Sequence, residues 1–228
     1  MTKRKGLIFD LDGTLLDTID DLRAALNIAL EKHGYPARTR EETLSFVGNG
    51  IGVLVERALP GGRENPAYPA VLSDFKAYYN DHMSDLTRPY NGIPELLRSL
   101  ADEGFLLAIV SNKFDAAVKA LATRYFPELA LLAIGESEKI ARKPAPDAVL
   151  HVLGQRGMQP ENCFYIGDSE IDLATARAAG VLCLSVTWGF RKPEFLIENG
   201  ATRLFDTPEE LRAYLLSPGT ADFSAGGA

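Results

Sequence analysis

The chain has 228 residues, of which 46% are hydrophobic and 24% are charged, and this composition is typical of one soluble domain or of one domain carrying an insertion. Its net charge of −7 at pH 7 argues against nucleic acid or an anionic membrane as a partner. Two cysteines imply no disulfide framework, no apolar run approaches the ~18 residues of a membrane span, and the basic start lacks a signal-peptide cleavage pattern. We therefore expect a cytoplasmic monomer or homodimer.

The first predicted element is a strand at residues 7–9, because an unbroken apolar run is typical of a strand buried on both faces. Asp10 ends this strand, Asp12 lies two residues further on, and Gly13 allows a tight turn close to a bound ligand. Two carboxylates this close repel each other unless they share a cation or one of them holds a proton. The pattern therefore predicts a metal-assisted acid–base site, with a simple turn as the alternative.

Helical periodicity dominates the next part of the chain. Apolar residues recur at helical spacing in residues 18–33, 41–46, 51–59 and 67–83, and we expect no strand among them. This predicts an all-helical insertion, called the cap, over residues 16–88. Because the cap interrupts the α/β region just after its first strand, we expect it to act as a lid beside the carboxyl ends of the strands.

From Tyr90 onward, predicted strands alternate with helices, as in a parallel sheet with crossover helices. The strands are expected at residues 106–110, 129–134, 163–166, 181–186 and 204–205, and the helices at residues 93–103, 116–124, 145–156, 171–179 and 209–216. The fold class is therefore α/β, with a core domain formed by residues 1–15 and 89–216. Residues 217–228, rich in Gly, Ala and Ser, are predicted to be a disordered tail.

Polar groups are expected at the same edge of this sheet as the first two carboxylates. Ser111, Asn112 and Lys113 follow the strand that ends at Val110, and they offer a hydroxyl, an amide and an ammonium group, although a polar loop is the alternative. Lys143 precedes a predicted helix and can bring a positive charge to this edge, although most lysines are simply solvated.

A second acidic cluster follows the strand at residues 163–166. Gly167 and Asp168 repeat the glycine turn and carboxylate found after the first strand, and Asp172 lies four residues after Asp168. Magnesium prefers a few carboxylates together with water and phosphate oxygens. The two acidic clusters are therefore expected to bind Mg²⁺, while the hydroxyl and ammonium groups supply the hydrogen bonds and charge that a phosphoryl group needs.

These four motifs, in this order, resemble those of the haloacid dehalogenase superfamily over about residues 5–216. The matching positions are residues 10–14 (Asp-Leu-Asp-Gly-Thr), Ser111, Lys143, and residues 167–169 with Asp172. The resemblance implies a Rossmann-like parallel sheet with a helical cap inserted after the first strand, in agreement with the pattern of elements above.

The resemblance also implies an activity, that of a Mg²⁺-dependent phosphatase, a phosphoric monoester hydrolase that works through an aspartyl-phosphate. In such an enzyme Asp10 is the nucleophile, and Asp12 protonates the leaving oxygen and later removes a proton from water. Asp10, Asp12 through its carbonyl, and Asp168 are the implied metal ligands. Asp172 is the implied supporting residue of the metal site.

Phosphate binding is likewise implied for a set of matching residues. Ser111 and Lys143 are expected to act in catalysis by binding phosphoryl oxygens. Gly13, Thr14 and Asn112 are expected to complete the phosphate site.

Within the superfamily, the sequence is most similar to the phosphoglycolate phosphatases, through residues 46–52, 54–59, 111–113 and 187–189. The implied partner is a small phosphorylated metabolite, with 2-phosphoglycolate as the first candidate. Gly48, Asn49 and Gly50 have little side-chain bulk, so their amides are expected to contact the substrate. An ordinary turn between two cap helices is the alternative for this loop.

Other functions remain open. A β-phosphoglucomutase-like phosphomutase would keep Asp12, and only kinetics would separate transfer to a sugar from transfer to water. Dehalogenases and phosphonatases lack this second carboxylate, so Asp12 argues against both. A non-catalytic metal-binding regulatory module would have little reason to keep every catalytic position.

Two other kinds of binding site are excluded because the spacing of their residues does not match this sequence. A calcium-binding EF-hand loop counted from Asp10 would need Gly and Glu at positions that hold Leu15 and Asp21. The glycines of residues 48–52 resemble a dinucleotide-binding fingerprint, but Val53 occupies the third glycine position and no βαβ unit surrounds it.

Overall fold

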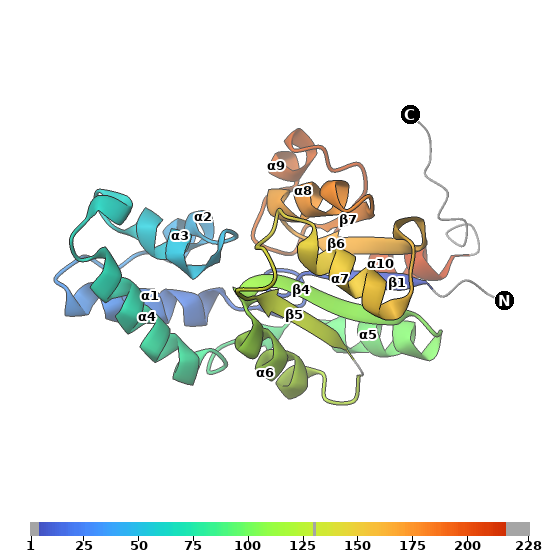
Figure 1. Cartoon of the computed structure of the whole chain (residues 1–228), viewed down its shortest axis with the longest axis horizontal. Helices are drawn as coiled ribbons and strands as arrows, with labels where there is room; N and C mark the ends of the chain where they lie inside the picture. Colours follow the sequence, from blue (N-terminus) through green and yellow to red (C-terminus); the bar gives the residue numbers. More distant parts are fainter. Residues whose placement is uncertain (1–4, 130, 218–228) are drawn as a thin grey trace. The chain divides into compact units, whose positions relative to one another are not determined.

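The computed structural model describes residues 5–129 and 131–217. They form two compact units, a smaller unit of residues 16–88 and a larger unit made of the described residues on either side of it (Figure 1). The predicted disordered tail lies outside the described residues, apart from Ser217. Among the described residues, no helix is both long enough and apolar enough to cross a membrane.

A parallel sheet forms the centre of the larger unit, with strand order β5-β4-β1-β6-β7-β8 (Figure 1). Its strands are β1 (Gly6–Phe9), β4 (Leu106–Phe114), β5 (Leu132–Glu136), β6 (Cys163–Gly167), β7 (Leu182–Val186) and β8 (Leu204–Phe205). The chain builds the sheet outward on one side of β1 and then outward on the other side, beginning with β6. Open α/β sheets bind ligands where the strand order reverses in this way, outside the carboxyl ends of the strands. The predicted α/β class is confirmed.

Helices cover both faces of this sheet. They are α5 (Ile93–Asp102), α6 (Asp115–Tyr125), α7 (Asp147–Arg156), α8 (Glu170–Ala178), α9 (Pro193–Glu198), α10 (Pro208–Leu216) and the short 3₁₀ helix η2 (Pro160–Asn162). Successive side chains of a strand point to opposite faces. On β6, Tyr165 lies in one buried cluster with residues of α7, α8 and α9, whereas the Phe164 ring lies 6.2 Å from the Tyr214 ring of α10. Burial on both faces explains the unbroken apolar runs of these strands.

The structure corrects the predicted end of β4. We predicted an end at Val110, but the strand continues to Phe114, and its pairing with β5 shifts register between these two residues. The polar residues 111–113 therefore lie within the strand and not after it. Gly135 of β5 makes this close pairing possible, because a Cβ atom there would lie 2.5 Å from the carbonyl oxygen of Lys113.

Two other elements also differ from the prediction. We predicted the β5 strand at residues 129–134, but it begins at Leu132, because the backbone amides of Leu129 and Leu131 form turn hydrogen bonds after α6. Helix α9 was missed, since six residues are too few to establish a helical period.

The smaller unit is mostly helical. It contains α1 (Ile19–Lys32), α2 (Arg40–Phe46), α3 (Gly50–Ala58), α4 (Tyr68–His82) and the 3₁₀ helix η1 (Gly62–Glu64), with α1 packed against α4 and α2 packed against both α1 and α3. No strand lies in the four helical-spacing stretches, as predicted, but the description of the cap as all-helical was wrong. Its first residues form β2 (Leu16–Asp17), which pairs with β3 (Arg88–Pro89), and these strands are too short to show alternation. The buried Asp21 carboxylate of α1 accepts hydrogen bonds from the backbone N–H groups of Leu86 and Thr87, which ties the start of this unit to its end.

Candidate active site

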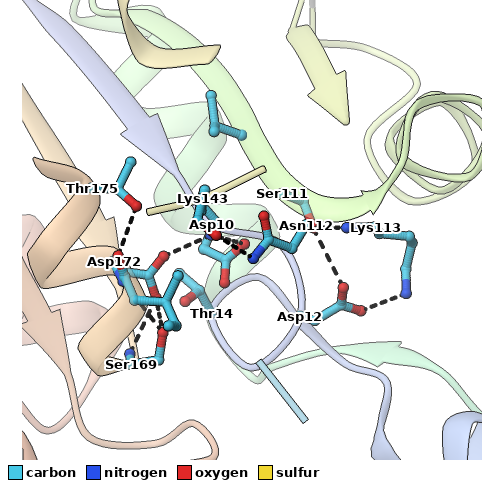
Figure 2. Close-up of polar contacts among 12 residues, drawn as sticks. Asp10, Asp12, Thr14, Ser111, Asn112, Lys113, Lys143, Ser169, Asp172 and Thr175 are labelled. Carbon is cyan, nitrogen blue, oxygen red and sulfur yellow. Dashed lines mark hydrogen bonds and ion pairs between the residues drawn. The ribbon is translucent and has the colours of Figure 1, made fainter. Parts of the chain in front are cut away.

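Side chains from the ends of β1, β4 and β6 gather at the carboxyl edge of the sheet (Figure 2). Asp10 directly follows β1, and its backbone N–H donates to the Ile166 carbonyl of β6 at 2.8 Å. The Asp10 side chain is buried, and its Oδ1 lies 2.9 Å from the ammonium of Lys143. This contact is an ion pair without hydrogen-bond alignment, so Oδ1 has no hydrogen-bond partner among the described residues. A buried carboxylate oxygen in this state fits a metal ligand or a nucleophile.

Lys143 reaches the site from the loop between β5 and α7. Its Nζ lies 2.7 Å from Asp172 Oδ1 and 3.0 Å from the Tyr165 hydroxyl. The Asn112 side-chain amide donates to the Lys143 carbonyl at 3.2 Å, which holds the loop against β4. Burial disfavours the charged ammonium, but Asp10 and Asp172 outweigh it and hold the pKa of Lys143 well above its usual value. Lys143 is therefore a fixed positive charge.

Asp172 uses both of its carboxylate oxygens within the protein. Its Oδ2 accepts from the backbone N–H and the hydroxyl of Ser169, at 3.1 and 2.6 Å, in a capping box at the start of α8. Its Oδ1 contacts Lys143 and the Tyr165 hydroxyl, the latter at 3.0 Å. This arrangement favours a supporting role for Asp172 at the predicted metal site. Sequence reasoning missed Tyr165, although a hydroxyl in an otherwise apolar strand, two residues before Gly167, was an available signal.

Asp168 is held from two directions. The Thr14 hydroxyl donates to Oδ1 at 2.9 Å, and the Phe190 backbone N–H donates to Oδ2 at 2.8 Å. Burial, reinforced by the nearby Asp172 carboxylate, raises the pKa of Asp168 from 3.8 to about 7.

The same two causes, burial first and the charge of Asp172 second, raise the pKa of Asp10 well above its usual value. Asp10, Asp168 and Asp172 each offer an oxygen, and these oxygens lie within 4.8 Å of one another. A buried group of hard oxygen donors whose charges repel each other fits a divalent cation such as Mg²⁺.

Two glycines let the backbone close around Asp168. Gly13 has φ 89°, which favours glycine, and a Cβ atom there would clash with the Asp168 carboxylate. A Cβ atom on Gly189 would clash with the Gly13 carbonyl oxygen and with Asp168 Cβ. The indole N–H of Trp188 donates to the Thr14 carbonyl at 3.0 Å, so the segment after β7 packs against the loop after β1. Sequence reasoning gave residues 187–189 no such role.

Asp12 lies on the β4 side of the site. Its Oδ1 is 2.9 Å from the ammonium of Lys113, and the Ser111 hydroxyl donates to Oδ2 over a long 3.5 Å. In Figure 2 the Asp12 carboxylate points toward Ser111 and Lys113, whereas Asp10 lies beside Lys143. The predicted acid–base group, Asp12, and the predicted nucleophile, Asp10, therefore contact different lysines.

The larger unit brings together most of the predicted site residues: Asp10, Asp12, Gly13, Thr14, Ser111, Asn112, Lys143, Asp168 and Asp172. The Thr14 hydroxyl and the Asn112 amide donate to protein acceptors, so these side chains position their neighbours. Gly48, Asn49 and Gly50 belong to the smaller unit, at the turn between α2 and α3, where Gly48 and Gly50 have φ of 111° and 75°. The α2–turn–α3 arrangement also rules out the βαβ unit that a dinucleotide fingerprint requires.

Comparison with known proteins identifies the family to which this chain belongs. The family model of haloacid dehalogenase-like hydrolases matches residues 7–186, and the chain belongs to this family. The predicted resemblance is confirmed.

Two relatives and one crystal structure are similar to this chain over most of its length. The phosphoglycolate phosphatase 1 of Pseudomonas aeruginosa is 34% identical over 215 residues, covering 90% of this chain and 77% of that protein. The phosphoglycolate phosphatase of Haemophilus influenzae is 30% identical over 222 residues, covering 94% of this chain and 99% of that protein. A crystal structure from Lactobacillus delbrueckii, provisionally assigned as a phosphoglycolate phosphatase, has a TM-score of 0.90 at 39% identity and covers 94% of this chain and 99% of its own.

Proposed function

We propose that this protein is a Mg²⁺-dependent phosphatase that hydrolyses a small phosphomonoester, 2-phosphoglycolate, through an aspartyl-phosphate. The observation that carries the proposal is the buried Asp10 carboxylate, ion-paired with Lys143 at 2.9 Å and grouped with Asp168 and Asp172. A carboxylate with an unbonded oxygen beside a fixed cation can attack a phosphorus atom whose oxygens that cation neutralises. The relatives named phosphoglycolate phosphatase support the choice of substrate.

The proposed reaction has two halves. In the first, an Asp10 oxygen forms a bond to phosphorus, the ester bond breaks, and Asp12 gives a proton to the leaving oxygen. In the second, Asp12 takes a proton from water while the water oxygen attacks phosphorus, which releases phosphate and restores the Asp10 carboxylate. The Ser111 hydroxyl and the Lys143 ammonium bind the phosphoryl oxygens in both halves, and the raised pKa of Lys143 keeps its charge throughout.

The donor set fits Mg²⁺, which Asp10, Asp168 and the Asp12 carbonyl would hold, with Asp172 in support. Mg²⁺ would supply positive charge beside the phosphoryl group and offset the repulsion among these carboxylates. Phosphate contacts from Gly13, Thr14 and Asn112 remain predictions, as does a cytoplasmic location.

The smaller unit is proposed to act as the cap that closes over the leaving group. Its turn at residues 48–50 has little side-chain bulk, so its amides could bind a small anionic group such as the carboxylate of 2-phosphoglycolate. This would make the substrate choice a property of the cap and the chemistry a property of the larger unit.

A panel of phosphate esters tests the proposal. The purified protein with Mg²⁺ should release phosphate from 2-phosphoglycolate faster than from sugar phosphates or p-nitrophenyl phosphate, and acid quenching should trap an acyl phosphate that Asp10→Asn cannot form. Conversion of β-glucose 1-phosphate to its 6-phosphate isomer without phosphate release would point to the phosphomutase instead. A protein that binds Mg²⁺ but turns over no ester would refute both and favour the regulatory module.

A further inference from the structure

Lys113 is a buried cation at the site that the proposed reaction leaves without a role. Its side chain is 3% exposed, and its Nζ lies 2.9 Å from Oδ1 of Asp12, whose side chain is 20% exposed. Its backbone N–H donates to the Ser111 hydroxyl at 3.1 Å, and that hydroxyl in turn donates to the other Asp12 oxygen. One short segment of β4 thus contacts both oxygens of the acid–base carboxylate (Figure 2).

The sheet fixes the backbone that carries Lys113. The register shift between Val110 and Phe114 sets this segment apart from the regular pairing of β4 with β5. Gly135 packs directly against the Lys113 carbonyl, and its own N–H donates to Asp115 Oδ1 at 3.1 Å. The backbone of Lys113 therefore lies close against β5, and its ammonium lies 2.9 Å from Asp12 Oδ1.

Stability alone gives a weak reason for this pair. Burying an ammonium costs solvation free energy that its ion pair recovers only in part, and exchanging such pairs for apolar side chains is often neutral or stabilising. The Asp12 side chain, by contrast, could adopt several rotamers if no neighbouring group held it. A proton transfer needs the carboxylate in one orientation, because small errors in placement slow it strongly.

We infer that Lys113 is a positioning residue, which holds the Asp12 carboxylate against Ser111 in the orientation from which Asp12 exchanges protons with the leaving oxygen and with water. The inference rests on the proposed phosphatase function. It assigns Lys113 no contact with phosphate, so its effect should pass entirely through Asp12.

Leaving-group dependence separates this role from a structural one. An alkyl leaving group such as glycolate must be protonated, whereas p-nitrophenolate leaves without a proton. In Lys113→Met, the single-turnover rate of phosphoenzyme formation from 2-phosphoglycolate should fall by about 10–100-fold, the size of a partly lost acid contribution. The rate from p-nitrophenyl phosphate should stay within about threefold of wild type, because only the acid is disturbed.

The matched control is Lys119→Met, which breaks an exposed lysine pair with Asp115 on α6 and should leave both rates unchanged. Lys113→Arg keeps the positive charge and should recover part of the rate with 2-phosphoglycolate. If Lys113→Met fails to fold, as judged by its circular dichroism, Lys113→Arg is compared with Lys119→Arg instead. In that comparison Lys113→Arg should show a smaller loss of rate, and only with the alkyl ester 2-phosphoglycolate.

A double-mutant cycle then decides whether the effect passes through Asp12. Adding Lys113→Met to Asp12→Asn should leave the residual rate with 2-phosphoglycolate unchanged. A further loss in that background would mean that Lys113 contacts the substrate, and equal losses for both esters in the single variant would mean a structural role. Either result overturns the inference while the wild-type phosphoenzyme upholds the proposed function. A wild-type protein that forms no phosphoenzyme from either ester refutes the function itself.

Discussion

When divalent cations are removed, the free energy of unfolding of this protein should fall as the pH rises. The Asp168 carboxyl has a pKa of about 7 in the folded protein, against 3.8 for an ordinary aspartate, chiefly because it is buried and next because it lies near Asp172. Between these values the folded protein holds a proton that the unfolded chain has lost, so the free energy of unfolding falls as the pH rises. The stabilisation is complete below about pH 4 and lost as the pH passes about 7.

The magnitude follows from the difference in pKa. About three pKa units correspond to about 4 kcal/mol of unfolding free energy. For a chain of this length, that change lowers the melting temperature by about 8–16 °C. The raised pKa of Asp10 has the same sign and adds to the effect.

Mg²⁺ should reverse this loss, because it binds the ionised carboxylates of the folded state and competes with protons for them. We therefore expect the Mg²⁺-induced rise in melting temperature to be larger at pH 8 than at pH 5.5, measured by near-ultraviolet circular dichroism with chelator or with Mg²⁺. Asp168→Asn removes the titrating group and should flatten the pH dependence of the chelated protein. It leaves the three histidines in place, so their contribution cancels in the comparison. An equal pH dependence in the wild type and the variant, or a Mg²⁺ effect independent of pH, would refute the reasoning.

Four further outcomes are expected. Asp10→Asn should fold normally yet lose turnover and the acid-trapped phosphoenzyme, because the amide is not nucleophilic; substantial residual turnover would contradict its assignment as nucleophile. Gly189→Ala should weaken Mg²⁺ binding and activity together, since the added Cβ clashes with Asp168 and the loop after β1; isothermal titration with unchanged affinity would contradict this. Asp21→Ala should lower the free energy of unfolding by about 1–3 kcal/mol in urea, by leaving backbone N–H groups unpaired, with Asp21→Asn as the milder control. Gly50→Val, at a position with φ 75°, should displace the backbone amides of the turn and lower kcat/KM for 2-phosphoglycolate more than for p-nitrophenyl phosphate, and equal losses would argue that the turn at residues 48–50 has no role in specificity.

The sequence was informative where one local pattern carries the structure. The apolar runs before Asp10 and Gly167 predicted β1 and β6, because a strand buried on both faces needs apolar side chains at every position. The carboxylates after these strands were expected to meet, since parallel neighbours end at the same edge of the sheet. The structure does bring Asp10 and Asp168 together there.

The sequence was uninformative where geometry depends on residues far apart in the chain. Phe190 donates through its backbone, which no residue type reveals, and Gly189 matters only because Gly13 happens to lie against it. The end of β4 was misjudged for the same reason. Polar residues 111–113 look like a loop by themselves, but they continue the strand, and Gly135 on the neighbouring strand leaves room for their backbone.

The buried charges that suit this site to bind a cation also lower the stability of the folded chain. Asp10, Asp168 and Asp172 are three buried carboxylates that lie close together, and Lys143 forms ion pairs with two of them, Asp10 and Asp172. Burial first, and the charge of Asp172 second, raise the pKa values of Asp10 and Asp168. A core built for stability alone would replace such a cluster with apolar side chains. The surrounding hydrogen bonds instead hold the carboxylates in place. The site is thus short of positive charge until a cation enters, and the same shortage that destabilises the folded chain would favour the binding of Mg²⁺.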